Sequence, residues 1–120
     1  MYQWYFLLLC FSTSGDNNIA IGYNALYAGT NASGNIGMGR NSLMSNNTGN
    51  RNIAIGYNSM DEPDTENDNL AIGYEALGAS IEGGELNVGI GNYTWDAMTS
   101  GDGNTGIGYS TLSAVTTGNN

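Results

Sequence analysis

Residues 52–60 read Asn-Ile-Ala-Ile-Gly-Tyr-Asn-Ser-Met, and variants of this stretch recur along the chain. Six copies begin at residues 18, 35, 52, 69, 87 and 104, so the period is 17 with a single step of 18. Such a unit is too short for a two-helix repeat and too long for a heptad. Its Ile-small-Ile-Gly segment alternates with a period of two, which is typical of a β-strand. Strands are therefore predicted near residues 18–22, 35–39, 52–56, 69–73, 87–91 and 104–108.

The repeat predicts an all-β fold, a β-solenoid (β-roll) of about six 17-residue coils. Equivalent strands of successive coils would stack about 4.8 Å apart. We expect residues 15–120 to form one repeat domain that is part of a longer array. The 120-residue length leaves room for one domain at most.

The columns of equivalent residues predict how each coil is built. We expect the isoleucine columns that begin at Ile19 and Ile21 to point inward, together with the leucine column that begins at Leu26. The small column between the isoleucines would then face outward, where small residues let the backbone of another chain come close. It consists of Ala20, Gly37, Ala54, Ala71, Gly89 and Gly106.

Two further columns predict turn structure. The glycine that ends each strand segment, Gly22 in the first copy, should supply a positive φ or a close backbone approach at a corner. The asparagine that opens each copy should stack into a ladder of side-chain amides that satisfy backbone groups one coil away. This asparagine column consists of Asn18, Asn35, Asn52, Asn69, Asn87 and Asn104.

Composition and charge exclude several classes of function. Eleven acids against two arginines give a formal net charge of −9, which repels nucleic acids and anionic membrane surfaces. A single cysteine allows neither an intrachain disulfide framework nor a four-cysteine zinc site. The chain has no histidine, and so lacks the usual general base near neutral pH and the commonest metal ligand.

The Asn-Ile-Ala-Ile-Gly motif followed by a small residue and leucine resembles the head repeats of trimeric autotransporter adhesins, the YadA-like β-roll. It is also similar to Asn/Gly-rich repeats of phage tail fibres. The resemblance covers residues 15–120, although the adhesin heads use a somewhat shorter coil. It implies a homotrimer that is exposed at a surface and attaches to host or extracellular-matrix ligands. The implied location is extracellular, on a cell surface with an outer-membrane anchor in another region, or in a virion fibre.

Residues 1–14 lie outside the repeat and include the apolar stretch MYQWYFLLLCF. This stretch is too short to span a bilayer, so no membrane insertion by this segment is expected. It is interpreted either as the apolar leader of a secretory signal peptide, cut after Ser14, or as the start of a fragment. The array opens a seventh unit at Gly118, which favours a longer parent chain.

No catalytic, cofactor-binding or metal-binding residue is predicted. Five acids lie within residues 61–68, but their spacing matches no calcium loop, so we expect a solvated loop. Glycosidase chemistry needs two facing carboxylates, and nothing in the sequence marks out such a pair. The acids considered for it were Glu75, Glu82, Glu85 and Asp96.

Three hypotheses about function follow. The leading one is a non-enzymatic adhesin head or fibre segment that displays loops for attachment. The second is an ice-binding or other flat-surface-binding solenoid, which is expected to carry rows of threonine that the small column lacks. The third is a polysaccharide-degrading β-helix enzyme, for which so narrow a coil offers no evident cleft.

Overall fold

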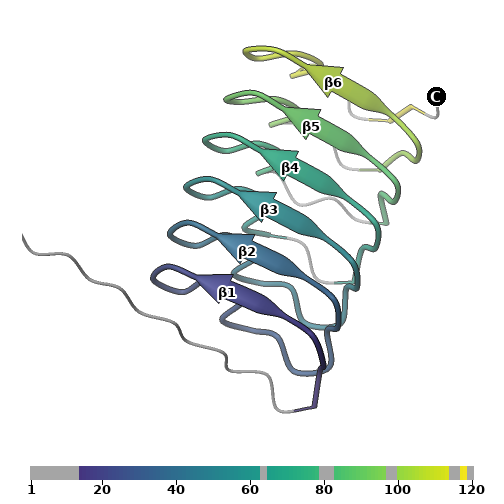
Figure 1. Ribbon diagram of the computed structural model, residues 1–120. Coiled ribbons are helices and arrows are strands. Elements are labelled where there is room, and N and C mark those ends of the chain that lie inside the picture. The colour runs from purple at the N-terminus through teal and green to yellow at the C-terminus, as the bar shows by residue number, and fades with distance from the viewer. Residues whose placement is uncertain (1–13, 63–64, 79–82, 97–99, 114–116, 119–120) are drawn as a thin grey trace, which may run out of the picture.

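The computed structural model is a β-solenoid whose six short strands stack on the same side (Figure 1). It describes residues 14–62, 65–78, 83–96, 100–113 and 117–118, so all of the N-terminal segment 1–14 except Ser14 lies outside it. The fold is all-β, as predicted. The strands are β1 (Ile19–Ile21), β2 (Ile36–Met38), β3 (Ile53–Ile55), β4 (Leu70–Ile72), β5 (Val88–Ile90) and β6 (Thr105–Ile107).

The six strands form one parallel sheet in chain order, with equivalent positions of successive copies paired. Ile53 of β3 pairs with Leu70 of β4, for example, and Leu70 with Val88 of β5. The extra residue of the one 18-residue step falls between Leu77 and Gly84, after the strand, so the register of the sheet is unchanged. Each strand lies within a predicted segment.

The corner glycines show both features that were predicted for them. Their φ values run from 125° to 143°, a region that L side chains rarely adopt. The first five also lie against the corner glycine of the next coil: a Cβ on Gly22 would be 2.6 Å from the carbonyl oxygen of Gly39. Any side chain at this column would therefore push adjacent coils apart. These glycines are Gly22, Gly39, Gly56, Gly73, Gly91 and Gly108.

The asparagine ladder is also confirmed. Asn52 is fully buried, and its Oδ1 accepts a hydrogen bond from the backbone N–H of Asn69, the equivalent residue one coil on, at 3.0 Å. Its Nδ2 donates to the backbone carbonyl of Glu66 at 2.7 Å. Each amide thus satisfies one backbone donor and one backbone acceptor, which would cost roughly 1–3 kcal/mol apiece if left unpaired. The same pair of bonds recurs at Asn18, Asn35, Asn69 and Asn87.

The prediction of which strand face is inside was wrong. The small column is buried in all six strands, with Ala54 and Ala71 fully enclosed. The two isoleucine columns point outward, and Ile19 is 47% exposed. The leucine column does point inward, as predicted. Its members are Leu26, Leu43, Met60, Leu77, Trp95 and Leu112.

The thickness of the coil explains this reversal. A Cβ on Gly37 would lie 3.3 Å from Cγ of Leu26, and one on Gly89 would lie 3.2 Å from Cγ of Leu77. The inward strand residue therefore meets a large side chain of the preceding coil directly. Only alanine or glycine fits there, so the isoleucines must take the other face.

The leucine column reaches the core through an unusual backbone. Its residues have φ between 46° and 61°, the left-handed region, which costs a bulky residue roughly 1–2 kcal/mol. Burying a leucine or methionine side chain contributes about 1.5–3 kcal/mol, enough to offset that strain. Serine or threonine hydroxyls beside this column bond to backbone carbonyls. Thr94 donates to the carbonyl of Gly108 at 2.7 Å, and Ser59 to that of Ala71 at 3.2 Å.

Trp95 is the largest fully buried side chain in the described part of the chain, and Gly106 is the strand residue that makes room for it. A Cβ on Gly106 would overlap Nε1 of Trp95 and lie 2.7 Å from its Cδ1. Three strands earlier, at the level of β3, the equivalent residues are Leu43 and Ala54, and both are fully buried. At the level of β6, the smaller strand residue Gly106 therefore compensates for the larger side chain of Trp95.

We predict that Gly106→Ala destabilises the protein by about 1–3 kcal/mol, because the added methyl overpacks the core against Trp95. The same substitution in a Trp95→Leu background should cost less than about 1 kcal/mol, since it recreates the pairing of Leu43 with Ala54. Urea unfolding of the four proteins of this double-mutant cycle measures the coupling. Equal losses in both backgrounds would contradict the proposed compensation.

A second prediction concerns the asparagine ladder. Asn52→Asp should destabilise the fold by more than about 3 kcal/mol, because it buries a carboxylate and aims it at the carbonyl of Glu66. Asn58→Asp is the matched control. Asn58 is half-buried, and its Oδ1 accepts a bond from Asn41 Nδ2 at 3.1 Å, a role that an aspartate oxygen keeps. Thermal unfolding followed by circular dichroism compares the two, and similar losses would argue against a special role of the ladder.

Candidate functional site: an apolar sheet face between two ladders

The outward face of the sheet is a continuous apolar surface. Two residues of each strand point outward, and of these twelve only Thr105 is polar. The remaining eleven are Ile19, Ile21, Ile36, Met38, Ile53, Ile55, Leu70, Ile72, Val88, Ile90 and Ile107. All are half-buried or exposed, and Ile107 in β6 is 66% exposed.

This face is unusual for a parallel sheet. Parallel sheets are normally covered on both sides, and their strands then read as near-continuous apolar runs. Among the described residues, only the face with the small column is covered. A large exposed apolar patch on a protein surface commonly marks an interaction site.

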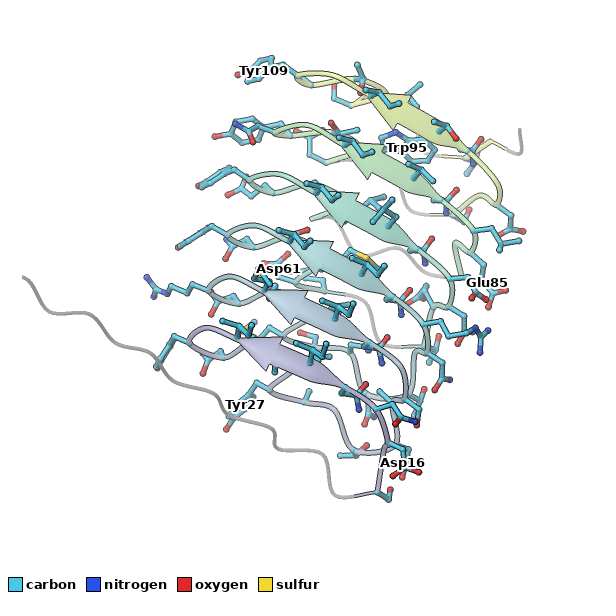
Figure 2. The ribbon with its side chains drawn as sticks, viewed as in Figure 1. Asp16, Tyr27, Asp61, Glu85, Trp95 and Tyr109 are labelled. Carbon is cyan, nitrogen blue, oxygen red and sulfur yellow. The ribbon has the colours of Figure 1, made fainter. Side chains whose placement is uncertain are left out.

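A ladder of aromatic side chains borders the face at the ends of the strands, seen as the stack below Tyr109 in Figure 2. The rings of Tyr57 and Tyr74 are stacked, with centroids 5.3 Å apart and planes 6° apart. Tyr93 meets Tyr74 and Tyr109 edge to face, at 5.2 Å and 5.8 Å. We call Tyr23, Arg40, Tyr57, Tyr74, Tyr93 and Tyr109 the tyrosine ladder.

Arg40 is the one member of the tyrosine ladder that is not aromatic. Its guanidinium carbon lies 5.7 Å from the ring centroid of Tyr23 and 5.6 Å from that of Tyr57. Both distances are within the range of cation–π attraction. Arg40 therefore continues the stack electrostatically while separating Tyr23 from the other rings.

Charged and amide side chains border the opposite edge, before the strands, where Figure 2 labels Asp16 and Glu85. We call Asp16, Arg51, Asn67, Asp68, Glu85 and Asp102 the polar ladder. Arg51 forms an ion pair with Asp68 one coil on, with 2.6 Å between Nε and Oδ1. The hydrogen bond from Arg51 lowers the pKa of Asp68 and raises that of Arg51. Asn67 Nδ2 donates to Glu85 at 2.8 Å, and the backbone N–H of Glu85 donates to Asp102 at 2.9 Å. The apolar face thus lies between an aromatic edge and a largely acidic edge.

The acidic segment 61–68 is not simply the solvated loop that was expected. Glu66 is only 4% exposed, and its carboxylate accepts bonds from the backbone N–H groups of Thr65 and Gly83. Asp68 is ion-paired with Arg51. Burial, with smaller contributions from Glu62 and Glu75, raises the pKa of Asp61 to about 6. Asp64 lies outside the described residues.

The carboxylates considered for glycosidase chemistry lie in separate parts of the fold. Glu75 follows β4. A hydrogen bond with its side chain is the main cause that raises the pKa of Tyr74 to about 12. Glu85 precedes β5, on the polar ladder. Asp96 is an exposed residue next to the leucine column, and Glu82 lies outside the described residues.

Sequence reasoning missed both main features of this site. The apolar face was assigned to the interior, and the tyrosine ladder was not recognised. The sequence does carry a signal for that ladder, because tyrosine follows the corner glycine at Tyr23, Tyr57, Tyr74 and Tyr109. In a solenoid with a fixed register, equal positions in successive coils must stack.

The half-buried Asp61 makes stability depend on pH. Its folded-state pKa of about 6 lies above the unfolded value near 3.9, so the folded state favours the protonated acid. Its contribution is therefore present below about pH 4 and lost as the pH rises through about 6. We predict that Asp61→Asn is more stable than the wild type at pH 7.5, on the order of 1 kcal/mol after solvent screening, and equally stable at pH 4.

Melting temperatures of wild type and variant at the two pH values measure this effect. Asp96→Asn, at an exposed aspartate, is the matched control and should not reproduce it. A constant difference between Asp61→Asn and wild type across this range would contradict the assignment.

Two further findings bear on function. None of the described segments contains a helix that is long and apolar enough to cross a membrane. Within the same segments, no group of three or more histidine, cysteine, aspartate or glutamate residues could hold a metal ion. Comparison with protein-family models, with curated proteins and with solved structures found no match to this chain.

Proposed function

We propose that this chain is a non-enzymatic attachment element, a segment of an adhesin head or fibre that assembles with copies of itself through the apolar sheet face. The observation that carries the proposal is the outward face of β1–β6, apolar at eleven of twelve positions. A face of this kind is stabilised when another apolar surface removes it from water, at about 25 cal/mol per Å². The homotrimer that the repeat resemblance implies would do this around a common axis.

The interface we propose differs from the one expected from the sequence. The small column was expected to contact other chains, but it is buried inside the coil, so that expectation was wrong. The isoleucine columns take its place. Thr105 is the only polar residue on this surface, which leaves few polar groups to be desolvated on association.

The size of the face predicts how strong this association is. Six strands about 4.8 Å apart and three residues wide cover roughly 250–300 Å². Stable interfaces bury about 800 Å² on each partner, so the strand face alone is too small. The tyrosine ladder and the polar ladder must contribute. We therefore expect association that depends on protein concentration.

The outer loops would then remain for contacts with host or matrix surfaces. The net charge of −9 favours partners that are neutral or basic. We place the element outside the cell, on a cell surface or in a virion fibre. This location follows from the resemblance of the repeat.

Neither alternative gains support from an observed feature. Thr105 is the only threonine among the outward strand residues, so the rows expected of an ice-binding face are missing there as well. The carboxylates Glu75 and Glu85 lie beyond opposite ends of the strands, which does not provide the facing pair of a glycosidase.

The face assignment is tested by comparing Ile55→Asp with Ala54→Asp, which place the same charge on opposite faces of β3. Ile55→Asp should keep the β-type circular dichroism spectrum and lose association, because a charge is tolerated in water but not in a dry interface. Ala54→Asp should lose the folded spectrum, because it buries the charge inside the coil. Light scattering over a range of concentrations measures molar mass.

Three outcomes would count against the proposal. The first is a wild type that stays monomeric at the highest attainable concentration. The second is an Ile55→Asp variant with unchanged mass. The third is thermal hysteresis of a monomeric wild type, which would favour the ice-binding alternative.

A further inference from the structure

The tyrosine ladder contains one pair of rings placed for a covalent reaction with each other. Tyr57 and Tyr74 occupy equivalent positions of adjacent coils, 17 residues apart, and their rings are stacked nearly parallel at 5.3 Å. Both are partly open to solvent, at 38% and 39% exposure, so a soluble oxidant can reach them. The paired strands β3 and β4 hold the two backbones in register.

We propose that Tyr57 and Tyr74 are an oxidative modification site at which the two phenol rings couple to a dityrosine that joins the third and fourth coils. The co-substrate is a one-electron oxidant, such as a haem peroxidase with hydrogen peroxide. This proposal is independent of the apolar face, because it requires only the stacking of coils within one chain.

The reaction balances as follows. Each phenol loses one electron and its hydroxyl proton, giving two phenoxyl radicals whose unpaired electrons are shared with the ring carbons next to the hydroxyl. A carbon–carbon bond forms between one such carbon of each ring, and the hydrogens on those carbons then move to the oxygens and restore both phenols. Two hydrogen atoms leave in total, and one hydrogen peroxide accepts them and becomes two water molecules.

The surroundings of the pair favour this reaction over others. The contacts of Tyr93 with Tyr74 and Tyr109 are edge to face, with ring planes 60° and 79° apart, unlike the nearly parallel rings of Tyr57 and Tyr74. Tyr23 is separated from Tyr57 by Arg40.

A covalent link here would join two coils that are otherwise connected only by the backbone between them and by non-covalent contacts. Closing a loop in the unfolded chain reduces its conformational entropy and thereby stabilises the folded state, as a disulfide does. The sequence holds a single cysteine, so no disulfide within one chain can fill this role. A dityrosine would be a covalent cross-link with the same effect, formed by two residues that are already in contact.

The experiment treats the full chain, at low concentration and with Cys10 alkylated, with a haem peroxidase and hydrogen peroxide. A parallel reaction uses a photo-oxidised ruthenium tris-bipyridine complex with persulfate, a small oxidant that rules out poor access of the enzyme. We expect the blue fluorescence of dityrosine and a monomer that has lost the mass of two hydrogen atoms. Cleavage at the acidic residues 61–68 separates Tyr57 from Tyr74, so the link appears as two joined peptides.

Matched variants locate the site. Tyr57→Phe and Tyr74→Phe should reduce the dityrosine yield to that of the chain oxidised in denaturant, while Tyr23→Phe should keep the wild-type yield. Arg40→Tyr should extend the run of rings and add cross-linked peptides that contain Tyr23. The oxidised wild type should melt at a higher temperature than the untreated protein, and oxidised Tyr57→Phe should not.

Two results would overturn the proposal. One is a failure of both oxidants to produce a link between Tyr57 and Tyr74. The other is a set of links, within or between chains, spread over the tyrosines without preference for this pair. Because the readout is a link within a monomer, loss of association in the Ile55→Asp variant would leave it unaffected.

Discussion

The interior of each coil has room for one large side chain between its strand and its facing turn. The leucine column supplies that side chain, so the strand residue opposite must be alanine or glycine. The isoleucines are then forced onto the outer face, although they are the most apolar residues of the repeat. Where the core holds Trp95, even alanine is too large and Gly106 takes the strand position. The exposed apolar face is thus a consequence of a narrow core.

Much of the fold could be predicted because a repeat multiplies each local signal. One Asn-Ile-Ala-Ile-Gly segment is weak evidence, but six in register fix the period, the strands, the corner glycines and the asparagine ladder. The orientation of the strands could not be derived in the same way. Alternation shows that two faces differ, and the usual rule places the larger apolar residues inside. That rule assumes a thick core. The core of this coil is thin, because a Cβ on Gly37 would already lie 3.3 Å from Cγ of Leu26.

The candidate site was less predictable than the fold because its parts depend on how coils stack. A tyrosine after a corner glycine looks like an ordinary surface residue in one copy. It becomes part of a ladder only when the neighbouring coil places Tyr74 against Tyr57. The polar ladder has the same origin, since Arg51 finds Asp68 one full coil away. Both ladders vary in sequence more than the asparagine column, whose amides must satisfy buried backbone groups.

The single 18-residue step shows where this architecture tolerates change. One additional residue lies between Leu77 and Gly84, yet β4 and β5 pair in the same register as every other pair. The length of this connection can therefore change without a change in the register of the sheet. An added residue between Asn69 and Gly73, in contrast, would shift every column. Foreign peptides inserted after the leucine column would be displayed at one-coil intervals on an intact scaffold. The repeat thus offers a template for presenting several epitopes at a set spacing.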